Sequence, residues 1–597
     1  MKTLALDFET FFSADFTLKK LTTEAYIRDP QFEALCLGIY DPTTKTKTWI
    51  GQEDIPRWGL SVDWAQTAVL AHHAHFDGLI FAHHYGVRPA FWFDTLCMAR
   101  AIHGNHVSVS LANLLKLYDI PEKTVPYDAF RGRRWVNILP ELRHELGQGA
   151  ADDCHKTWQI FQKLLPGFPL QELRLIDMTV RMFTEPQLIG DVGALQQVQA
   201  DEWVRKDELL QRLGVSKADL NSTAKFAALL EELGVEVDTK TTPTGNVVPA
   251  IAATDPFMKE LETHVDPTVA DLARARLEVR STINETRAGR LAGMAGRGRL
   301  PIYLQYCGAH TTRWSGGDKV NLQNLPRSGE LRRCISAPDG YLLLEPDLSQ
   351  IECRILLWLA GQFDQLDAFR QGRDLYSEMA SKFYGVKVSK AMPAERGTGK
   401  QLVLSCGYGA GAVTIQATAA RGTYGPAVQM GLDDAERAKN LYRSTNYRVV
   451  AMWKEAEWLL GQIILNATHE WGPMRLHNKR LYLPNGLAIN YETVSHEQGE
   501  FKMRKRAGIT KMYGAKLVEN AVQGLARVVV SQAMLRLSEM GYKALNTTHD
   551  SLMILLPDDD RVEATTATVL AELSRPPTWM PDIPLAAEGR ATRSYAK

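Results

Sequence analysis

The sequence predicts a small α/β domain followed by a larger α+β domain with helical insertions. In roughly the first 160 residues, the strand-like runs TLALDFE (residues 3–9) and Ala68–Ala71 alternate with helical patterns. The stretch Pro166–Pro169 contains two prolines and a glycine, which cannot continue a helix, and it therefore predicts a linker. Beyond it, long helical patterns are followed by short β-type runs. A length of 597 residues by itself suggests about three to five domains.

The elements follow in order from the periodicity. Helical patterns at 110–120 and 152–165 complete the first unit. From about 170 to 298 the chain is predicted to be mainly helical, because apolar residues recur at spacings of three and four, as over 224–234. Residues 301–345 are irregular and end in the strand-like run YLLL. A helix-rich stretch follows over about 374–470, and β-type runs return at KRLYLPNGLAINY and KALNTTHDSLMILLP.

Composition excludes several classes of protein. With 45% hydrophobic and 23% charged residues, the chain is not an extended disordered protein. No apolar run approaches the ~20 residues of a membrane span, and Asp7 interrupts an N-terminal apolar stretch already too short for a signal peptide. The seven cysteines include no CxxC pair, so neither a disulfide framework nor a zinc ribbon is expected. We expect a soluble, cytoplasmic protein without a membrane partner.

Charge is uneven along a chain whose formal net charge is zero. Between Asp271 and Arg333, eleven arginines and one lysine stand against five acids, a local excess of +7. Such a run is often only a solvated face. However, arginine is the side chain suited to bidentate phosphate contacts, so this stretch is also a candidate nucleic-acid surface.

Two aspartates end or join β-type runs. Asp347 follows the YLLL run, and Asp550 lies between two β-type runs, where a hairpin would put it at the tip. If the segments are neighbours in one sheet, the carboxylates face each other, and two Mg²⁺ ions are the common solution for such a pair in phosphoryl transfer. Each aspartate alone is more often a cap or turn residue.

A third segment, AERGTGKQLVLSCGYGAG, carries side chains at successive spacings of four. On a helix, Arg396, Lys400, Leu404 and Tyr408 would line one face. Two cations beside an aromatic ring suit a triphosphate with a stacked base. The alternative is an amphipathic helix whose long cationic side chains cover apolar surface.

These segments, in their order, resemble motifs A, B and C of family A DNA polymerases. The motifs are DLSQIECR, the Arg396–Lys400–Tyr408 series and HDS; TTRWSGGDKVNLQNLPR and ENAVQGLAR resemble two further stretches of the family. The match spans roughly 300–597. It implies a right-hand polymerase domain over 166–597, with a thumb at about 195–300, a palm at about 301–375 and 520–597, and fingers at about 376–519.

The resemblance also implies roles for individual residues. Asp347 and Asp550 would hold two Mg²⁺, with Mn²⁺ as a substitute. Lys400 would bind the triphosphate and protonate the leaving pyrophosphate. The other residues implied to meet the incoming nucleotide are Arg396 (triphosphate), Tyr408 (the pocket for the new base pair), Glu352 (exclusion of a ribose 2′-OH) and Leu404. Those implied to contact primer–template DNA are Arg313, Gln523 and His549.

Three positions depart from the family pattern. Ser551 stands where the family usually has Glu, which removes one carboxylate of motif C but leaves the two aspartates. Leu404 replaces the usual Phe or Tyr and puts the family's sugar discrimination in doubt. Tyr376 occupies a position that is often His.

The N-terminal unit resembles a DEDD-type 3′–5′ exonuclease of RNase H-like fold, assigned to residues 1–165. LDFET, AHHAHFD and GAADDCHKTWQIF look like its three motifs, which implies the metal ligands Asp7, Glu9, Asp77 and Asp153. On a strand, Asp7 and Glu9 share a face because side chains alternate with period two.

This second match is also imperfect. His73 replaces the usual Asn, Gly149 stands where one subgroup has the Tyr that orients the attacking water, and Gln148 stands where another has His. We expect an exonuclease that is slow or that recruits another residue, such as His155. The five histidines of HHAHFDGLIFAHH could instead form a zinc site, but no cysteines stand nearby at ligand spacing.

The combined prediction is a DNA-directed DNA polymerase with a proofreading exonuclease. Its implied partners are primer–template DNA and dNTPs, with replisome proteins as further candidates, and the compact layout resembles bacteriophage replicative enzymes. Two alternatives remain. A single-subunit RNA polymerase shares the palm, although Glu352 argues against it. A non-catalytic DNA-binding scaffold is disfavoured by the presence of Asp347, Lys400 and Asp550.

Overall fold

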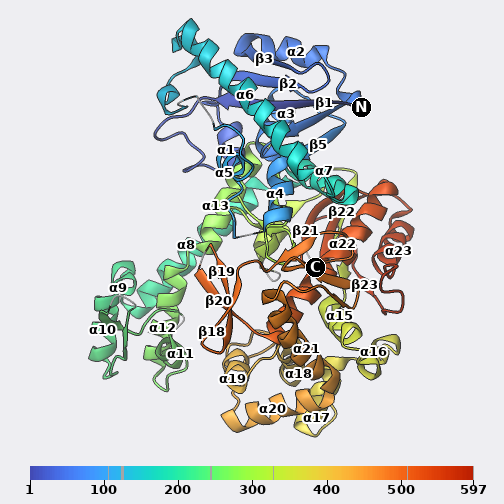
Figure 1. Cartoon of the computed structure of the whole chain (residues 1–597). Helices are drawn as coiled ribbons and strands as arrows, with labels where there is room; N and C mark the ends of the chain where they lie inside the picture. The colour runs from blue at the N-terminus through green and yellow to red at the C-terminus, as the bar shows by residue number, and fades with distance from the viewer. Residues whose placement is uncertain are drawn as a thin grey trace.

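The computed structural model describes residues 1–595 except 105, 123–124, 126, 243–244, 254, 327–328 and 507. As predicted, an α/β domain precedes a larger α+β unit (Figure 1). Within these described ranges, no helix is both long and apolar enough to cross a bilayer.

The N-terminal domain is built on a five-stranded mixed sheet of order β3-β2-β1-β4-β5. The antiparallel part comprises β1 (Lys2–Thr10), β2 (Ala34–Asp41) and β3 (Thr46–Gly51), and the parallel part adds β4 (Thr67–Ala71) and β5 (Phe91–Asp94). The first strand is therefore central in the sheet order. Its partner β4 pairs with residues 2–5, so Asp7 and Glu9 lie just beyond the end of that pairing, opposite Gly38 and Cys36 of β2.

Helices cover this sheet. The long helix α6 (Pro140–Leu164) packs on β1, β2 and β3, and α3 (Ala74–His84) contacts β1, β4 and β5 (Figure 1). The approach of α6 to β2 is very close: a Cβ added to Gly38 would lie 2.3 Å from the backbone carbon of Ala150. Only glycine permits this approach, which fixes the position of α6 over the first strand. The domain also contains α1 (Thr23–Ile27), α2 (Ile55–Ser61), α4 (Thr95–His103) and α5 (Leu111–Leu117).

The predicted linker is short. Helix α6 ends at Leu164 and α7 (Leu170–Thr184) begins directly after Pro169. The predicted mainly helical region follows as α8 (Val192–Leu213), α9 (Lys217–Asn221), α10 (Thr223–Glu232), α11 (Pro256–Glu262), α12 (Pro267–Arg280) and α13 (Ile283–Gly296), with a small hairpin of β7 (Thr239–Thr241) and β8 (Val247–Pro249).

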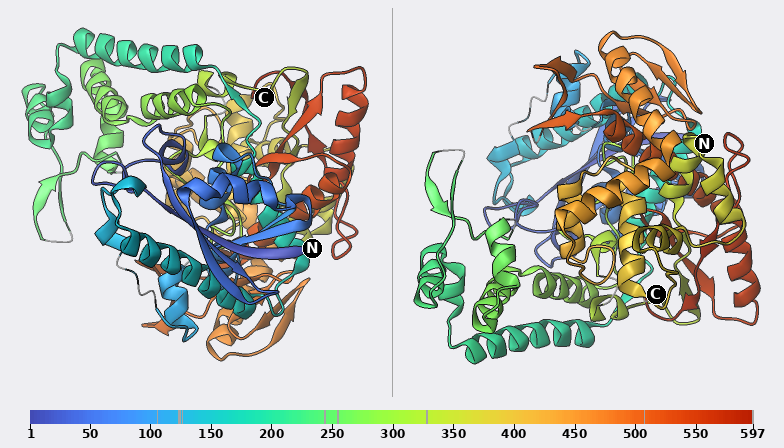
Figure 2. Two further views of the ribbon diagram at one scale, coloured as in Figure 1. Left: turned by 90° about the horizontal axis from the view of Figure 1, so that it is seen from above. Right: turned by 90° about the horizontal axis from the view of Figure 1, so that it is seen from below.

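Helices α9–α12 form a lobe that projects from the body (Figures 1 and 2). The lobe has its own hydrophobic core, which includes the fully buried Leu220, Phe226 and Met258 and is separate from the core of the rest of the chain. Arg276 lies in this core, with its guanidinium 4.5 Å from the Phe226 ring centroid.

The centre of the second unit is a six-stranded sheet of order β23-β13-β22-β12-β24, with β21 paired to β22. Its strands are β12 (Tyr341–Leu344), β13 (Asp347–Leu348), β21 (Ala544–Thr548), β22 (Ser551–Pro557), β23 (Ala587–Glu588) and β24 (Ala591–Thr592). Helices α22 (Gly514–Glu539) and α23 (Val562–Leu573) pack on it, and α15 (Ile351–Leu359) packs on α22.

The region predicted to be the fingers combines helices with two small sheets. Helix α16 (Phe363–Arg370) precedes this region, and its helices are α17 (Leu375–Tyr384), α18 (Pro393–Cys406), α19 (Ala412–Ala420), α20 (Leu432–Thr445) and α21 (Tyr447–Ile464). A four-stranded sheet contains β14 (His469–Trp471), β15 (Met474–His477), β16 (Arg480–Tyr482) and β17 (Ala488–Asn490). A three-stranded sheet contains β18 (Val494–Glu497), β19 (Glu500–Lys505) and β20 (Gly508–Met512).

Short two-stranded pairings complete the fold. Strand β6 (Ile189–Gly190) pairs with β11 (Ile335–Ser336) beside α14 (Glu330–Arg333), and β9 (Leu304–Gln305) pairs with β10 (Ser315–Gly316). These pairings join the chain after α7 to the segment that leads into the central sheet. The irregular stretch predicted over 301–345 therefore bridges the helical region and the sheet.

Candidate active sites

The two aspartates predicted to form a pair are neighbours in the central sheet. In the β13–β22 pairing Asp347 lies opposite Ser551, and the Leu348 backbone N–H donates to the Asp550 carbonyl at 3.0 Å. The predicted hairpin is confirmed: β21 and β22 are joined by His549 and Asp550 alone, and His549 takes the left-handed conformation at φ 55°. A two-residue turn of this kind places Asp550 at the hairpin tip.

The electrostatics of this site reflect the proximity of the two acids. Burial and the negative charge of Asp347 raise the pKa of Asp550 to about 7. A cation bound between two neighbouring carboxyl groups offsets their mutual repulsion and stabilises the ionised form of both. The donor set is therefore suited to a divalent cation with oxygen ligands.

Ser551 makes a structural contact in place of the missing family carboxylate. Its side chain is buried, and its hydroxyl donates to the Thr548 carbonyl at 3.2 Å across the base of the hairpin. The substitution thus supports the turn that presents Asp550.

Glu352, on the first turn of α15, is at the centre of a polar cluster. Arg313 forms an ion pair with its carboxylate, and the Tyr408 hydroxyl donates to Glu352 Oε2 at 3.3 Å. Burial, followed by the charge of Glu352, raises the pKa of Tyr408 well above its usual range. Glu352, predicted to face the sugar, therefore contacts both Arg313, predicted to touch DNA, and Tyr408, predicted to shape the base pocket.

Helix α18 carries the predicted cationic series only in part. Arg396, Lys400 and Leu404 lie on the helix, all half-buried, but the helix ends at Cys406. Tyr408 lies in the following turn, where Gly409 has φ 84°, so the expectation that all four side chains share one helical face is wrong for Tyr408. Gly409, directly after Tyr408, takes a left-handed conformation that does not continue the helix.

Arg396 is held in place by a local acid. Its Nε donates to Asp374 Oδ2 at 2.7 Å, and its guanidinium lies 5.3 Å from the centroid of the Tyr376 ring. The Tyr that replaces the family's usual His thus provides an aromatic surface beneath this arginine. Asp374 was not predicted from the sequence, because it lies at the N-terminus of a different helix, α17.

Gln523 and His549, predicted to contact DNA, lie on different elements near the same hairpin. Gln523, on α22, accepts a hydrogen bond from Thr311 Oγ1 at 3.3 Å, and His549 is exposed at the β21–β22 turn. Gln323 Nε2 donates to the Thr547 carbonyl at 2.8 Å, which ties the NLQNLPR motif to the hairpin. Arg327, at the end of that motif, lies outside the described residues.

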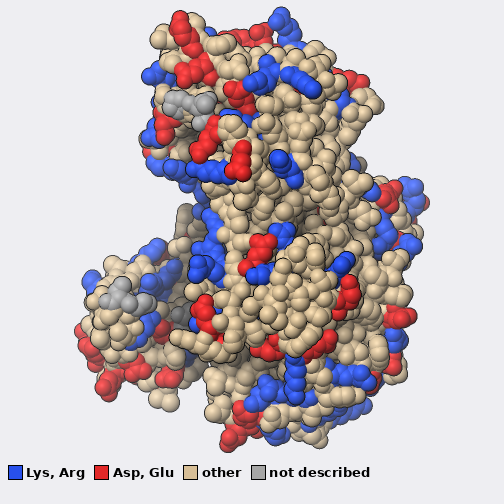
Figure 3. All heavy atoms as spheres, in the orientation of Figure 1, with Lys and Arg blue, Asp and Glu red and all other residues tan. Residues whose placement is uncertain are grey.

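The arginine-rich stretch 271–333 is only partly a surface. Several of its arginines have partners within the protein: for example, Arg297 binds Glu24 through two hydrogen bonds of 2.9 and 2.8 Å, Arg276 is buried in the lobe, and Arg332 donates to the Leu325 carbonyl. Figure 3 shows Lys and Arg side chains bordering the hollow between the α9–α12 lobe and the body, and acidic side chains along the lobe's outer rim. Fewer arginines of this stretch are therefore available to contact nucleic acid than the sequence suggested.

The N-terminal domain gathers a second set of carboxylates. Oxygens of Asp7, Glu9 and Asp153 all lie within 4.8 Å of one another, on β1 and α6. Asp77, on α3, is outside this group but close to it: burial and then the charge of Asp7 raise its pKa well above the usual range. Its Oδ1 accepts the Phe8 backbone N–H at 3.1 Å. The four predicted ligands therefore converge, and Asp77 and Asp153 are both buried.

Tyr127 is a residue of this site that the sequence did not single out. It begins the short helix η3 (Tyr127–Phe130), and its hydroxyl donates to Asp153 Oδ2 at 2.9 Å. Burial and the charges of Glu9 and Asp153 raise its pKa. Three-dimensional proximity is the only signal, since residue 127 is 26 positions from Asp153 and belongs to none of the three motifs.

The histidines of the second motif contact other parts of the fold. His73 has φ 85° and its Nε2 is 2.7 Å from the Tyr303 hydroxyl, and His84 Nε2 is 2.8 Å from the Ile27 carbonyl. Burial lowers the pKa of His75 to about 3. Among the described residues, the group of potential ligands close enough for one ion contains no histidine.

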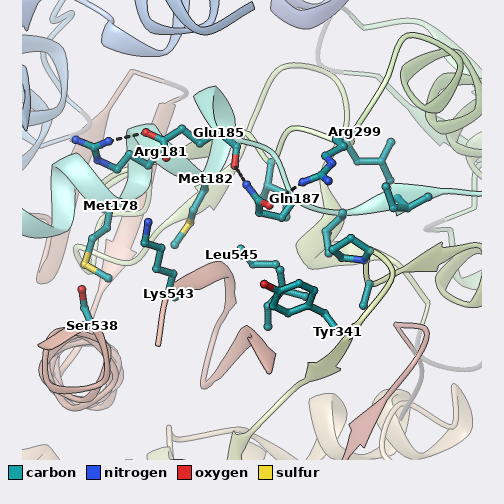
Figure 4. Close-up of a pocket in the computed structure, with 18 of the residues that line it drawn as sticks. Met178, Arg181, Met182, Glu185, Gln187, Arg299, Tyr341, Ser538, Lys543 and Leu545 are labelled. Atoms are coloured by element: carbon teal, nitrogen blue, oxygen red, sulfur yellow. Dashed lines mark hydrogen bonds and ion pairs between the residues drawn. The ribbon is translucent and has the colours of Figure 1, made fainter. Parts of the chain in front are cut away.

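A cavity of about 1210 Å³ lies apart from both carboxylate sites, between α7, the central sheet and the end of α22 (Figure 4). None of its described lining residues is a predicted site residue. Its arginines are engaged: Arg181 pairs with Glu185 at 2.5 Å, and Arg299 donates to Gln187 at 2.8 Å.

Comparison with known proteins agrees with this arrangement. The model of "DNA polymerase family A" matches residues 194–597. A DNA polymerase of Bacillus phage SP02 is 25% identical, over 100% of both chains. DNA polymerase I of Pseudomonas aeruginosa is 28% identical over 78% of this chain and 50% of its own, so the chain spans about half the length of that relative.

The solved structures give the same fold. The POL domain of Pol1 from M. smegmatis, in complex with DNA primer-template and dNTP, aligns with a TM-score of 0.67 at 18% identity, covering 99% of this chain and 95% of that one. The alignment therefore includes the N-terminal α/β domain as well as the central sheet.

The family match over residues 194–597 places the chain in the class of template-directed nucleotide polymerases. Within that class, the chain belongs to DNA polymerase family A and is a DNA-directed DNA polymerase. The scaffold and RNA polymerase alternatives are not favoured by these relatives.

Proposed function

We propose that this polymerase extends a DNA primer with dNTPs at the Asp347–Asp550 site, and that the N-terminal domain is a 3′–5′ exonuclease for proofreading. The observation that carries the first part is the adjacency of the two aspartates on β13 and at the β22 turn, where burial and the charge of Asp347 oppose the ionisation of Asp550.

Asp347 and Asp550 would hold two Mg²⁺ in the polymerase site, and Asp7, Glu9, Asp77 and Asp153 would hold the metals of the exonuclease site. Divalent ions bound there would lower the pKa of an attacking oxygen and neutralise charge on the phosphate. Carboxylate oxygens are the ligands that Mg²⁺ prefers, and Mn²⁺ accepts the same donors.

The chain's own residues then position the nucleotide. Arg396 and Lys400 would neutralise triphosphate oxygens, which requires Arg396 to exchange Asp374 for phosphate. As the primer 3′ oxygen bonds to the α-phosphorus, the bond to the β,γ-diphosphate breaks, and Lys400 would supply a proton to the leaving pyrophosphate. Tyr408 and Glu352 would shape the space for base and sugar.

Primer extension on a defined template tests the polymerase proposal. Asp550→Asn removes one carboxylate charge, and we expect the extension rate to fall by at least ~10³-fold, because the metal contribution is several kcal/mol and each ~1.4 kcal/mol is tenfold. Asp558→Asn is the matched control, since Asp558 is an exposed acid at the far end of the same strand. Equal extension by Asp550→Asn and wild type would contradict the assigned site.

Removal of a mismatched 3′ nucleotide tests the exonuclease proposal. Asp7→Ala should abolish removal while leaving extension intact, whereas Asp152→Asn should change neither. Asp152 is adjacent to Asp153 but pairs with Lys47 of β3 at 2.7 Å. If wild type and Asp7→Ala remove mismatches at indistinguishable rates, the domain has only a structural role.

A further inference from the structure

Gly149 lies very close to Val125 and Tyr127. A Cβ added to Gly149 would lie 2.3 Å from Val125 Cγ2, far inside van der Waals contact, and 3.5 Å from the Tyr127 hydroxyl oxygen. Position 149 is one helical turn before Asp153 on α6, so both face the same side of the helix. The absence of a side chain at 149 is therefore what allows Val125 and Tyr127 to reach the face that carries Asp153.

The Tyr127 hydroxyl lies at the edge of the carboxylate group. It donates a hydrogen bond to Asp153 Oδ2 at 2.9 Å. Carboxylate oxygens of Asp153, Asp7 and Glu9 lie within 4.8 Å of one another, close enough to bind one metal ion. A phenol has one donor and two acceptor lone pairs. While it donates to Asp153, the same oxygen can accept a hydrogen bond from a water molecule beside the carboxylates.

We propose that Tyr127 positions the attacking water of the exonuclease reaction, in place of a side chain at position 149. This inference rests on the proposed exonuclease function of the domain. By accepting a proton of the water in a hydrogen bond, the hydroxyl turns a water lone pair toward the phosphorus. Orientation of this kind is a recognised contribution to rate.

The step is a hydrolysis without redox change. The water oxygen bonds to the phosphorus of the terminal nucleotide while the bond from phosphorus to the preceding 3′ oxygen breaks. One water proton ends on that 3′ oxygen, the other is released with the nucleoside 5′-monophosphate, and Tyr127 remains protonated throughout.

His155, the substitute expected from the sequence, is less suitable. It lies two residues after Asp153 on the same helix, and residues two apart do not share a helical face. Its ring packs beside Tyr40, with centroids 4.7 Å apart. We therefore assign the water-positioning role to Tyr127, at the start of η3, rather than to a residue of α6.

Tyr127→Phe tests the proposal because it removes only the hydroxyl. We expect single-turnover excision of a 3′ mismatch at saturating DNA to slow by ~10–100-fold, with half-saturation by DNA and the rate of primer extension unchanged. Tyr118→Phe is the matched control: the Tyr118 hydroxyl also lies within hydrogen-bond distance of a side chain in this domain, His103 at 2.9 Å, and its loss should not change excision.

The outcomes separate the two proposals. If wild type is as slow as Asp7→Ala, both the exonuclease function and this inference fail. If wild type is active and Tyr127→Phe equals it, only this inference fails. If excess Mg²⁺ restores Tyr127→Phe to the wild-type rate, the hydroxyl acts on metal affinity through Asp153, and the positioning role is likewise overturned.

A second pair of variants tests the link to Gly149. Gly149→Ala should slow excision because its methyl group displaces Val125 and, with it, the Tyr127 hydroxyl. Adding Val125→Ala removes the clashing γ-methyl and should recover a large part of the loss. Equal excision by wild type and Gly149→Ala, or no recovery in the double variant, would contradict the coupling.

Discussion

A buried ion pair joins the helix after the linker to the helix beneath the central sheet. Arg527 of α22 donates to Glu172 of α7 through two hydrogen bonds of 2.7 and 2.6 Å, and each side chain is 1% exposed. Asn485 and Tyr306 donate to the same carboxylate, and the Arg527 guanidinium lies 4.6 Å from the Trp314 ring centroid. The carboxylate thus satisfies three buried donor groups at once.

Glu172→Gln should destabilise the protein strongly. The change removes the only negative charge of this cluster and leaves the guanidinium buried, a loss of about 3–5 kcal/mol for a broken buried pair. With an unfolding entropy of about 2.1 cal/mol/K per residue and a cooperative unit of about 400 residues, Tm should fall by ~4–6 °C. Differential scanning calorimetry measures this shift.

The same two helices offer a matched control. Arg174 of α7 pairs with Glu539 of α22 at 2.7 Å, but these side chains are 43% and 59% exposed. An exposed pair contributes about 0–1 kcal/mol, so Glu539→Gln should lower Tm by ~1 °C or less. If Glu172→Gln lowers Tm no more than Glu539→Gln, the reasoning from burial is refuted. Removing both charges, with Glu172→Met and Arg527→Met, should be less damaging than Glu172→Gln alone.

Three further predictions concern other sites. Burial raises the pKa of Asp318 to about 6, so the folded chain binds more protons than the unfolded one between about pH 4 and 6. As the pH rises through that window, the Tm of the wild type should fall relative to the Tm of Asp318→Asn, and above pH 7 the two Tm curves should run parallel. A Tm difference that stays constant from pH 4 to 7 would contradict this. Glu352→Ala should raise ribonucleotide incorporation in single-nucleotide extension assays by ~10-fold or more, because the carboxylate that Arg313 and Tyr408 hold in place would no longer exclude the ribose 2′-OH. An unchanged preference for deoxyribonucleotides would argue against this role of Glu352. Gly38→Ala should reduce mismatch excision more than extension, because its methyl would push α6 away from β2, and equal effects on both activities would show that the change is not local.

The sequence predicted the arrangement of the main elements because periodicity and turn residues are local signals. Asp550 at a hairpin tip followed from two β-type runs separated by polar residues, and the structure confirms the turn. The predicted helical position of Tyr408 was wrong because spacing alone does not reveal that the helix ends at Cys406, ahead of the left-handed Gly409.

Contacts between distant segments were not predictable in the same way. The sequence indicated an absent group at Gly149, but the segment that fills the space is contributed by residues outside every motif, and only tertiary packing places Tyr127 beside Asp153. Glu172 likewise lies in an ordinary amphipathic pattern, and its pairing with Arg527 bridges 355 positions of sequence. The run of arginines misled in part because charge counting cannot tell buried Arg276 from an exposed one.

The ties between the two units bear on how a primer end would travel. Thr23 of the first domain donates its backbone N–H to Asp318 at 2.8 Å, Glu24 binds Arg297, and the Trp92 backbone N–H donates to Asp177 of α7 at 2.8 Å. Anchored at several points, the N-terminal domain cannot swing freely about a four-residue hinge at 166–169. On the proposed function, the DNA rather than the protein domain would then have to move for editing. The 3′ end of the primer would separate from the template and cross a fixed distance from the polymerase site to the exonuclease site. The frequency of editing would therefore depend on how readily the terminal base pairs melt.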